Sequence, residues 1–105
     1  MPLTDVVYQF IPGLFRKKWV ERFIALRKIY DGYWRLILFK SSVATNKPLD
    51  FLPIKPNTSV CSDMILKHVL FIKTDDKEWL IDFRSDLNHN RWLDVIIKCI
   101  IKYNL

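Results

Sequence analysis

The sequence EWLIDFRSDLNHNRWLDVIIKCIIKY (residues 78–103) changes its hydrophobic period part of the way along, and this change decides the fold. In its first six residues the large side chains Trp79, Ile81 and Phe83 stand at every second position. A period of two is typical of a β-strand with one buried face. We therefore expect a strand over Glu78–Phe83.

From Ser85 onward the period becomes that of a helix. Ser85 and Asp86 are both residues that cap helices, and neither Pro nor Gly follows them. Apolar residues recur at spacings of three and four, which gives one wide apolar face. We expect a helix over residues 86–102, about 25 Å long at 1.5 Å per residue. The face comprises Trp92, Val95, Ile96, Cys99, Ile100 and Tyr103.

Upstream of this stretch, short β-prone runs alternate with turn residues. The turn pairs Pro12-Gly13 and Asp31-Gly32 mark two of the boundaries. The expected strands are Val6–Ile11, Trp19–Leu26, Tyr33–Lys40, Leu49–Ile54, Thr58–Cys61 and Lys67–Lys73. The order is thus seven strands and one C-terminal helix, without an internal repeat. Two bent antiparallel sheets need their open end covered, and a helix with one apolar face does that.

Three stretches carry a resemblance to a known family. In Lys17–Leu26, basic residues and a Trp are followed by an Arg, an aromatic and an aliphatic residue. Glu78–Ser85 is an expected strand followed directly by the start of the expected helix. Trp92 lies one to two turns into that helix. In this order they resemble pleckstrin-homology (PH) domains. The resemblance implies a PH domain over residues 4–104. Its fold would be mainly β, a bent seven-stranded antiparallel β-sandwich or partly open barrel capped by an amphipathic α-helix.

The resemblance also implies roles for the tryptophans and a subtype. It places Trp92, Trp79 and Trp19 in the core, with the Trp92 indole closing the open end of the barrel. The hairpin into Trp34–Phe39 most resembles the docking-protein and insulin-receptor-substrate adaptors. PH domains are binding modules, and the chain offers no convergent set of reactive groups. We therefore expect neither an enzyme nor a cofactor or metal.

The charge is uneven along the 105 residues. The net charge is +6, and residues 1–40 hold eight Lys/Arg against three Asp/Glu. A local excess of positive charge favours anionic partners. Two isolated cysteines indicate a reducing compartment, and no apolar run approaches the ~18 residues of a spanning helix. We expect a cytoplasmic protein that binds peripherally to membranes; nucleic acid fits less well, because the aromatics among the basic residues suit a core.

The resemblance implies a weakened lipid clamp. PH domains that bind phosphoinositides strongly use a basic residue late in strand one and a basic-x-Arg pair in strand two. Arg22 matches the arginine, and Lys17 matches a loop lysine. Val20, however, stands at the position of the basic residue that pairs with the arginine, and Gln9–Ile11 at the strand-one position carries no charge. Each missing charge-assisted contact is worth roughly 1.5–3 kcal/mol. We therefore expect recruitment to phosphoinositide-containing or other anionic membranes with low headgroup selectivity. Headgroup contacts are expected from Arg16, Lys17, Lys18, Arg22, Arg35 and Lys40.

Three questions stay open at this level. Leu14 and Phe15 either insert into the headgroup region or pack against the sheet edge. The function is either membrane recruitment or protein–protein binding as an adaptor with little lipid affinity. The helix also carries a second apolar stripe of Leu93, Ile97 and Ile101. Either Leu93 and Ile97 pack at the edge of the core and only Ile101 is exposed, or the stripe forms an interface with a protein partner, a second copy or a neighbouring segment of a longer parent chain.

Overall fold

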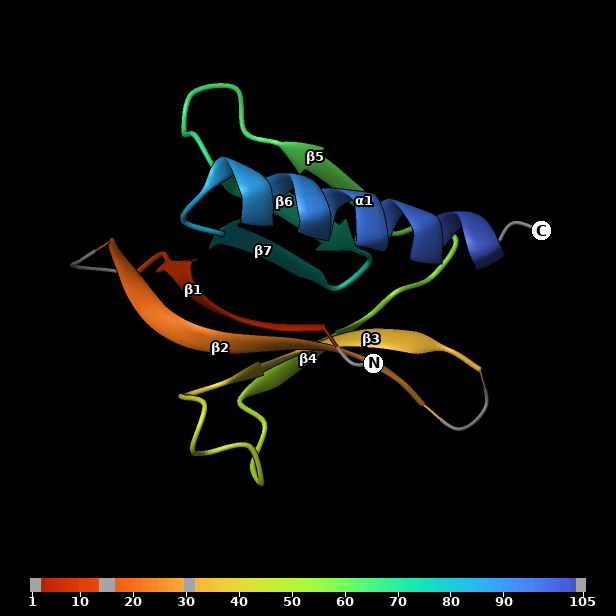
Figure 1. The fold of residues 1–105 in the computed structure, drawn as a ribbon, viewed down its shortest axis with the longest axis horizontal. Helices are drawn as coiled ribbons and strands as arrows, with labels where there is room; N and C mark the ends of the chain where they lie inside the picture. The colour runs from red at the N-terminus through yellow and green to blue at the C-terminus, as the bar shows by residue number, and fades with distance from the viewer. Residues whose placement is uncertain (1–2, 14–16, 30–31, 104–105) are drawn as a thin grey trace.

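A computed structural model describes residues 3–13, 17–29 and 32–103. Within them, seven strands form one antiparallel sheet in the order β4-β3-β2-β1-β7-β6-β5, followed by one helix (Figure 1). The elements are β1 (Leu3–Ile11), β2 (Lys18–Lys28), β3 (Trp34–Phe39), β4 (Asp50–Pro53), β5 (Ser59–Ser62), β6 (Val69–Thr74), β7 (Lys77–Asp82) and α1 (Asp86–Tyr103). This confirms the predicted fold class.

The sheet bends so that its two halves enclose the core. Figure 1 shows β5, β6 and β7 beside α1 in the upper half and β2, β3 and β4 in the lower half. On β2 and β3, Ile24, Leu26 and Leu36 point into the main core. Alternate residues point to the outer side, where Ala25 and other residues form a smaller cluster; the outer cluster is Ala25, Ile37 and Phe39 with Phe23 packed against it. Both faces of this hairpin are therefore apolar.

Trp92 closes the core beneath the helix. Its side chain is 0% exposed, and its ring lies 5.3 Å from that of Phe83 between centroids. The indole Nε1 donates a hydrogen bond to Asp5 Oδ2 on β1, 3.3 Å away. The contact links α1 to β1, which are far apart in sequence, and satisfies the indole's only polar group.

The helix begins with a side-chain cap. The Asn88 amide donates to Ser85 Oγ at 3.2 Å, and the His89 amide donates to the Ser85 carbonyl at 3.0 Å. Ser85 is thus the N-cap residue. Asp86 lies in the first turn and Lys102 in the last, each of the sign that the helix dipole favours.

Two expectations from the sequence were wrong. The strand expected from Lys67 begins at Val69, because His68 has the left-handed φ of 67° and cannot extend it. Trp19, expected in the core, is 37% exposed. Since Ile24 points inward, Trp19 points to the outer side of β2, where it packs edge-on against Phe10 at 5.2 Å.

One buried hydroxyl gives a stability prediction. Thr74 Oγ1 is buried and has no hydrogen-bond partner among the described residues. Thr74→Val should therefore leave the free energy of unfolding unchanged or raise it by up to about 1 kcal/mol, measured by urea denaturation.

The matched control is Thr58, which is also buried but accepts a hydrogen bond from the Lys55 amide at 2.8 Å. Thr58→Val should lower stability by about 1–3 kcal/mol, because it leaves that amide unsatisfied. Equal losses in the two variants would contradict the assignment of Thr74 as unpartnered.

Candidate functional site

We define the basic rim as four residues: Lys17 and Lys18 where β2 begins, Arg22 further along β2, and Lys40 directly after β3. Lys17, Lys18 and Lys40 are exposed and Arg22 is half-buried. The β2–β3 register pairs Phe23 with Phe39, which brings Arg22 and Lys40 side by side. Both line a cavity of about 100 Å³. None of the four forms an ion pair with a residue in the described ranges.

The two positions that lack a cation lie opposite one another. The β1–β2 register pairs Gln9 with Val20, next to the pair of Val7 with Arg22. Arg22 therefore stands beside an uncharged pair, and its guanidinium donates to the Glu21 carbonyl at 3.1 Å. A phosphate held by Arg22 would therefore find no second cation at these positions of β1 and β2, and its second contact would have to come from Lys40 after β3.

The structure places Arg35, a predicted headgroup contact, apart from Lys40. It lies opposite Arg27 near the start of β3, about 16 Å along the strand from Lys40 at 3.3 Å per residue. Its guanidinium lies over the ring of Phe51, 4.9 Å from the centroid. Arg16, Leu14 and Phe15 lie outside the described residues.

The β5–β6 loop carries an apolar tip that the sequence reading missed. Met64, Ile65 and Leu66 are 99%, 89% and 45% exposed. Figure 1 shows this loop on the same side of the view, the left, as the start of β2, which begins at Lys18. The available signal was a run of three apolar residues in a segment bounded by Asp63 and Lys67, where a turn between strands would normally be polar.

The loop is held in shape by Asp63 rather than by burial. Asp63 Oδ1 accepts hydrogen bonds from the Leu66 amide at 2.8 Å and the Ile65 amide at 2.9 Å. These bonds hold the pKa of Asp63 below its usual value. Because the folded pKa is lowered, the turn is stabilised at neutral pH, and this stabilisation is lost as the pH falls through that pKa.

The second stripe of α1 is divided in the structure. Leu93 packs partly buried against the core, whereas Ile97 and Ile101 are 39% and 51% exposed. The exposed pair lies one turn apart, away from the tryptophan that closes the core. In the described part of the chain, no helix is long and apolar enough to span a bilayer.

Comparisons with known proteins show the fold. No family model and no curated protein matches the sequence. The C-terminal PH domain of pleckstrin in complex with D-myo-Ins(1,2,3,5,6)P5 is 17% identical, with a TM-score of 0.76 over 93% of each chain. The PH domain of human oxysterol binding protein-related protein 11 is 12% identical, with a TM-score of 0.80 over 98% of this chain and 82% of that one. The chain therefore has the PH-domain fold.

Proposed function

We propose that this chain is a non-catalytic binding module that is recruited to anionic, phosphoinositide-containing membranes through its basic rim. The observation that carries the proposal is that the rim cations form no ion pair with any described residue. Each basic residue near an anionic leaflet contributes about 1 kcal/mol. The setting we propose is a cytoplasmic signalling or adaptor protein of the docking-protein type.

We propose low selectivity among headgroups. The C-terminal PH domain of pleckstrin is known in complexes with two inositol pentakisphosphates, so this fold holds such ligands in that protein. Here the Gln9–Val20 pair supplies no cation beside Arg22 on β1 or β2, which leaves Lys40, after β3, as its neighbouring cation. The rim therefore recognises negative charge more than the positions of phosphates on a ring.

Vesicle flotation at two ionic strengths tests the recruitment. The wild-type chain should bind vesicles of phosphatidylcholine with 30% phosphatidylserine at about 0.05 M salt, and binding should weaken several-fold at about 0.3 M, because salt screens exposed charges. Binding that does not depend on salt would contradict the role of the rim.

We further propose that apolar residues anchor the docked module. Leu14 and Phe15 are candidates from the sequence, and the exposed tip of the β5–β6 loop is a candidate from the structure. The loop lies on the same side of the view in Figure 1 as the start of β2. A protruding apolar turn suits a fluid interface, which needs no complementary pocket.

Replacing the tip by polar residues tests this anchor. Met64→Ser with Ile65→Ser should weaken vesicle binding by about tenfold or more, because burying either side chain is worth about 1.5–3 kcal/mol. The control is Ile101→Ser, an exposed apolar residue near the far end of α1. Equal affinity of the tip variant and the control would contradict insertion of the tip.

The second candidate function is protein binding through α1. The exposed Ile97 and Ile101 favour it, because apolar residues adjacent on one helix face often mark a contact. For a twofold dimer the same stripe would meet itself.

Sedimentation of the wild type and an Ile97→Glu, Ile101→Glu variant tests self-association. The wild type should sediment faster than the variant at about 100 µM, while both melt at similar temperatures. Two monomeric species of equal solubility would contradict the interface.

A further inference from the structure

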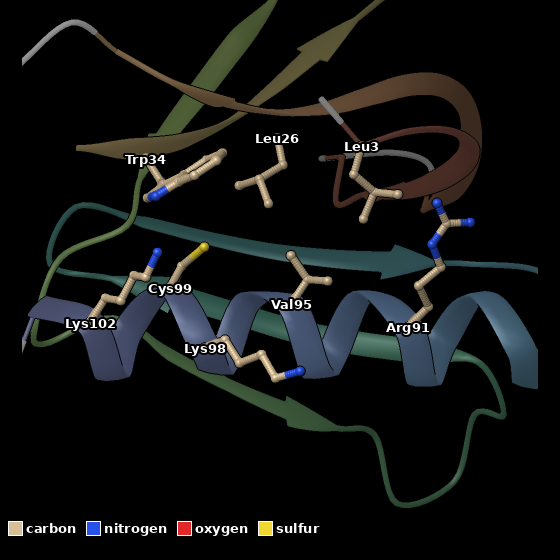
Figure 2. A pocket seen from close by; sticks show the side chains of 8 residues that line it. All are labelled: Leu3, Leu26, Trp34, Arg91, Val95, Lys98, Cys99 and Lys102. Atoms are coloured by element: carbon tan, nitrogen blue, oxygen red, sulfur yellow. The ribbon is translucent and has the colours of Figure 1, made fainter. Parts of the chain in front are cut away.

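A groove runs between α1 and the first three strands, on a side of the helix that the basic rim does not reach. Its volume is about 400 Å³. Figure 2 shows Leu3, Leu26 and Trp34 facing Val95 and Cys99 across the gap. Burial raises the pKa of the Cys99 thiol, with a smaller opposing effect of Lys102, so the thiol is an uncharged part of this wall. The interior of the groove is therefore apolar.

The cations of the groove lie along its helix wall. Arg91, Lys98 and Lys102 line it together with the apolar residues, and all three are exposed. From Arg91 to Lys102 the helix rises about 16 Å at 1.5 Å per residue. Lys98 forms an ion pair with Asp94 at 2.9 Å, whereas Arg91 and Lys102 form none with a described residue. An anionic group would therefore bind at an end of the groove rather than at its middle.

One end of the groove continues into a more polar chamber. This second cavity has a volume of about 220 Å³ and is lined by Lys28, Gly32, Trp34 and Lys102. Trp34 and Lys102 line both cavities, so the two are adjacent. Lys28 is also exposed and has no ion-pair partner in the described chain. The apolar groove thus ends at two lysines, Lys28 and Lys102.

This arrangement matches a hydrocarbon chain that ends in an anion. A peptide would bring an N–H and a C=O with every residue, and the Leu and Val side chains of the groove offer them no hydrogen-bond partner. A neutral sterol would leave the lysines without a role. Small-ligand sites are concave and mostly apolar with a few placed polar groups, at volumes of about 300–1,000 Å³. We infer that the groove binds a long-chain fatty acid, with its carboxylate between Lys28 and Lys102 and its chain along Leu26 and Val95.

The inference is tested with oleate on the delipidated chain in a Cys61→Ser background. The sequence has two cysteines, Cys61, which is exposed, and Cys99, which is buried. Replacing Cys61 therefore leaves Cys99 as the cysteine that a thiol reagent can modify. Below its micelle concentration, oleate should bind saturably at one molecule per chain in calorimetry and slow the alkylation of Cys99. Hexanoate, which lacks the chain, and methyl oleate, which lacks the charge, should do neither.

Variants at the polar end of the groove distinguish binding at a specific site from nonspecific binding of oleate. Lys28→Gln with Lys102→Gln should weaken oleate binding by about tenfold or more, since each charge-assisted contact contributes on that scale. The control, Lys55→Gln with Lys73→Gln, removes two exposed lysines outside both cavities and should bind like the wild type.

Three results would overturn the inference: no saturable binding up to about 100 µM oleate, binding that leaves Cys99 unprotected, or equal affinity in the two lysine variants. None of these depends on the basic rim, so recruitment to membranes and fatty-acid binding can fail separately.

Discussion

Replacing Trp92 by Ala is expected to lower the free energy of unfolding by about 3–5 kcal/mol. The side chain is 0% exposed, packs on Phe83 and donates its indole hydrogen bond to Asp5. Truncation would leave a cavity between α1 and β1 and remove a partner of the carboxylate. Urea denaturation measures the loss. By calorimetry the melting temperature should fall by about 12 °C or more, at 4–8 °C per kcal/mol for a domain near this size.

Trp19 provides the matched control, since it is the same residue type on the outer side of β2. It is 37% exposed and packs only edge-on against Phe10. Trp19→Ala should cost clearly less than Trp92→Ala, on the order of 1–2 kcal/mol. A Trp92→Ala protein that melts within two degrees or so of the wild type would show that α1 does not close the core as described.

Reversing the charge of the rim should nearly abolish binding to anionic vesicles. At about 1 kcal/mol per basic residue, neutralising three residues alone would cost about 100-fold in affinity, and reversal adds repulsion. Lys17→Glu, Lys18→Glu and Arg22→Glu together should therefore weaken partitioning on phosphatidylserine vesicles by at least about 100-fold, as measured by flotation.

A triple variant with the same net charge separates the rim from general electrostatics. Lys55, Lys73 and Lys98 lie after β4, on β6 and on α1, all exposed and outside the rim. Their reversal to Glu should weaken binding much less. Equal losses in the two variants would show that total charge drives association and that the rim has no special part in it.

Much of the fold could be predicted from the sequence because the last strand and the helix each have a single hydrophobic period. The alternation over Glu78–Phe83 and the helical spacing that includes Trp92 indicated a final strand and a capping helix. The face of β2 could not be predicted, since Phe23 and Ala25 on its outer side are also apolar and pack against Phe39. Apolar residues therefore occupy both faces of β2, and their alternation does not show that Trp19 lies on the outer face.

The site was less predictable, because it depends on which residues the chain brings together. Arg35 is close to Lys40 in sequence, but an extended strand separates them and Phe51 holds the guanidinium. The exposed tip at Met64 requires the Asp63 carboxylate to hold the turn, which composition does not reveal. The groove needs Leu3, and the strand expected from Val6 did not include it.

In the proposed function, the rim recognises an anionic surface more than any single headgroup. The direct measurement compares wild-type affinity for vesicles of equal surface charge, in which the charge comes from phosphatidylserine or from each phosphoinositide in turn. We expect affinities within about tenfold of one another, because the Gln9–Val20 pair supplies no second cation beside Arg22 on β1 or β2. A preference of about 100-fold or more for one phosphoinositide, or no binding to any of these vesicles, would contradict it.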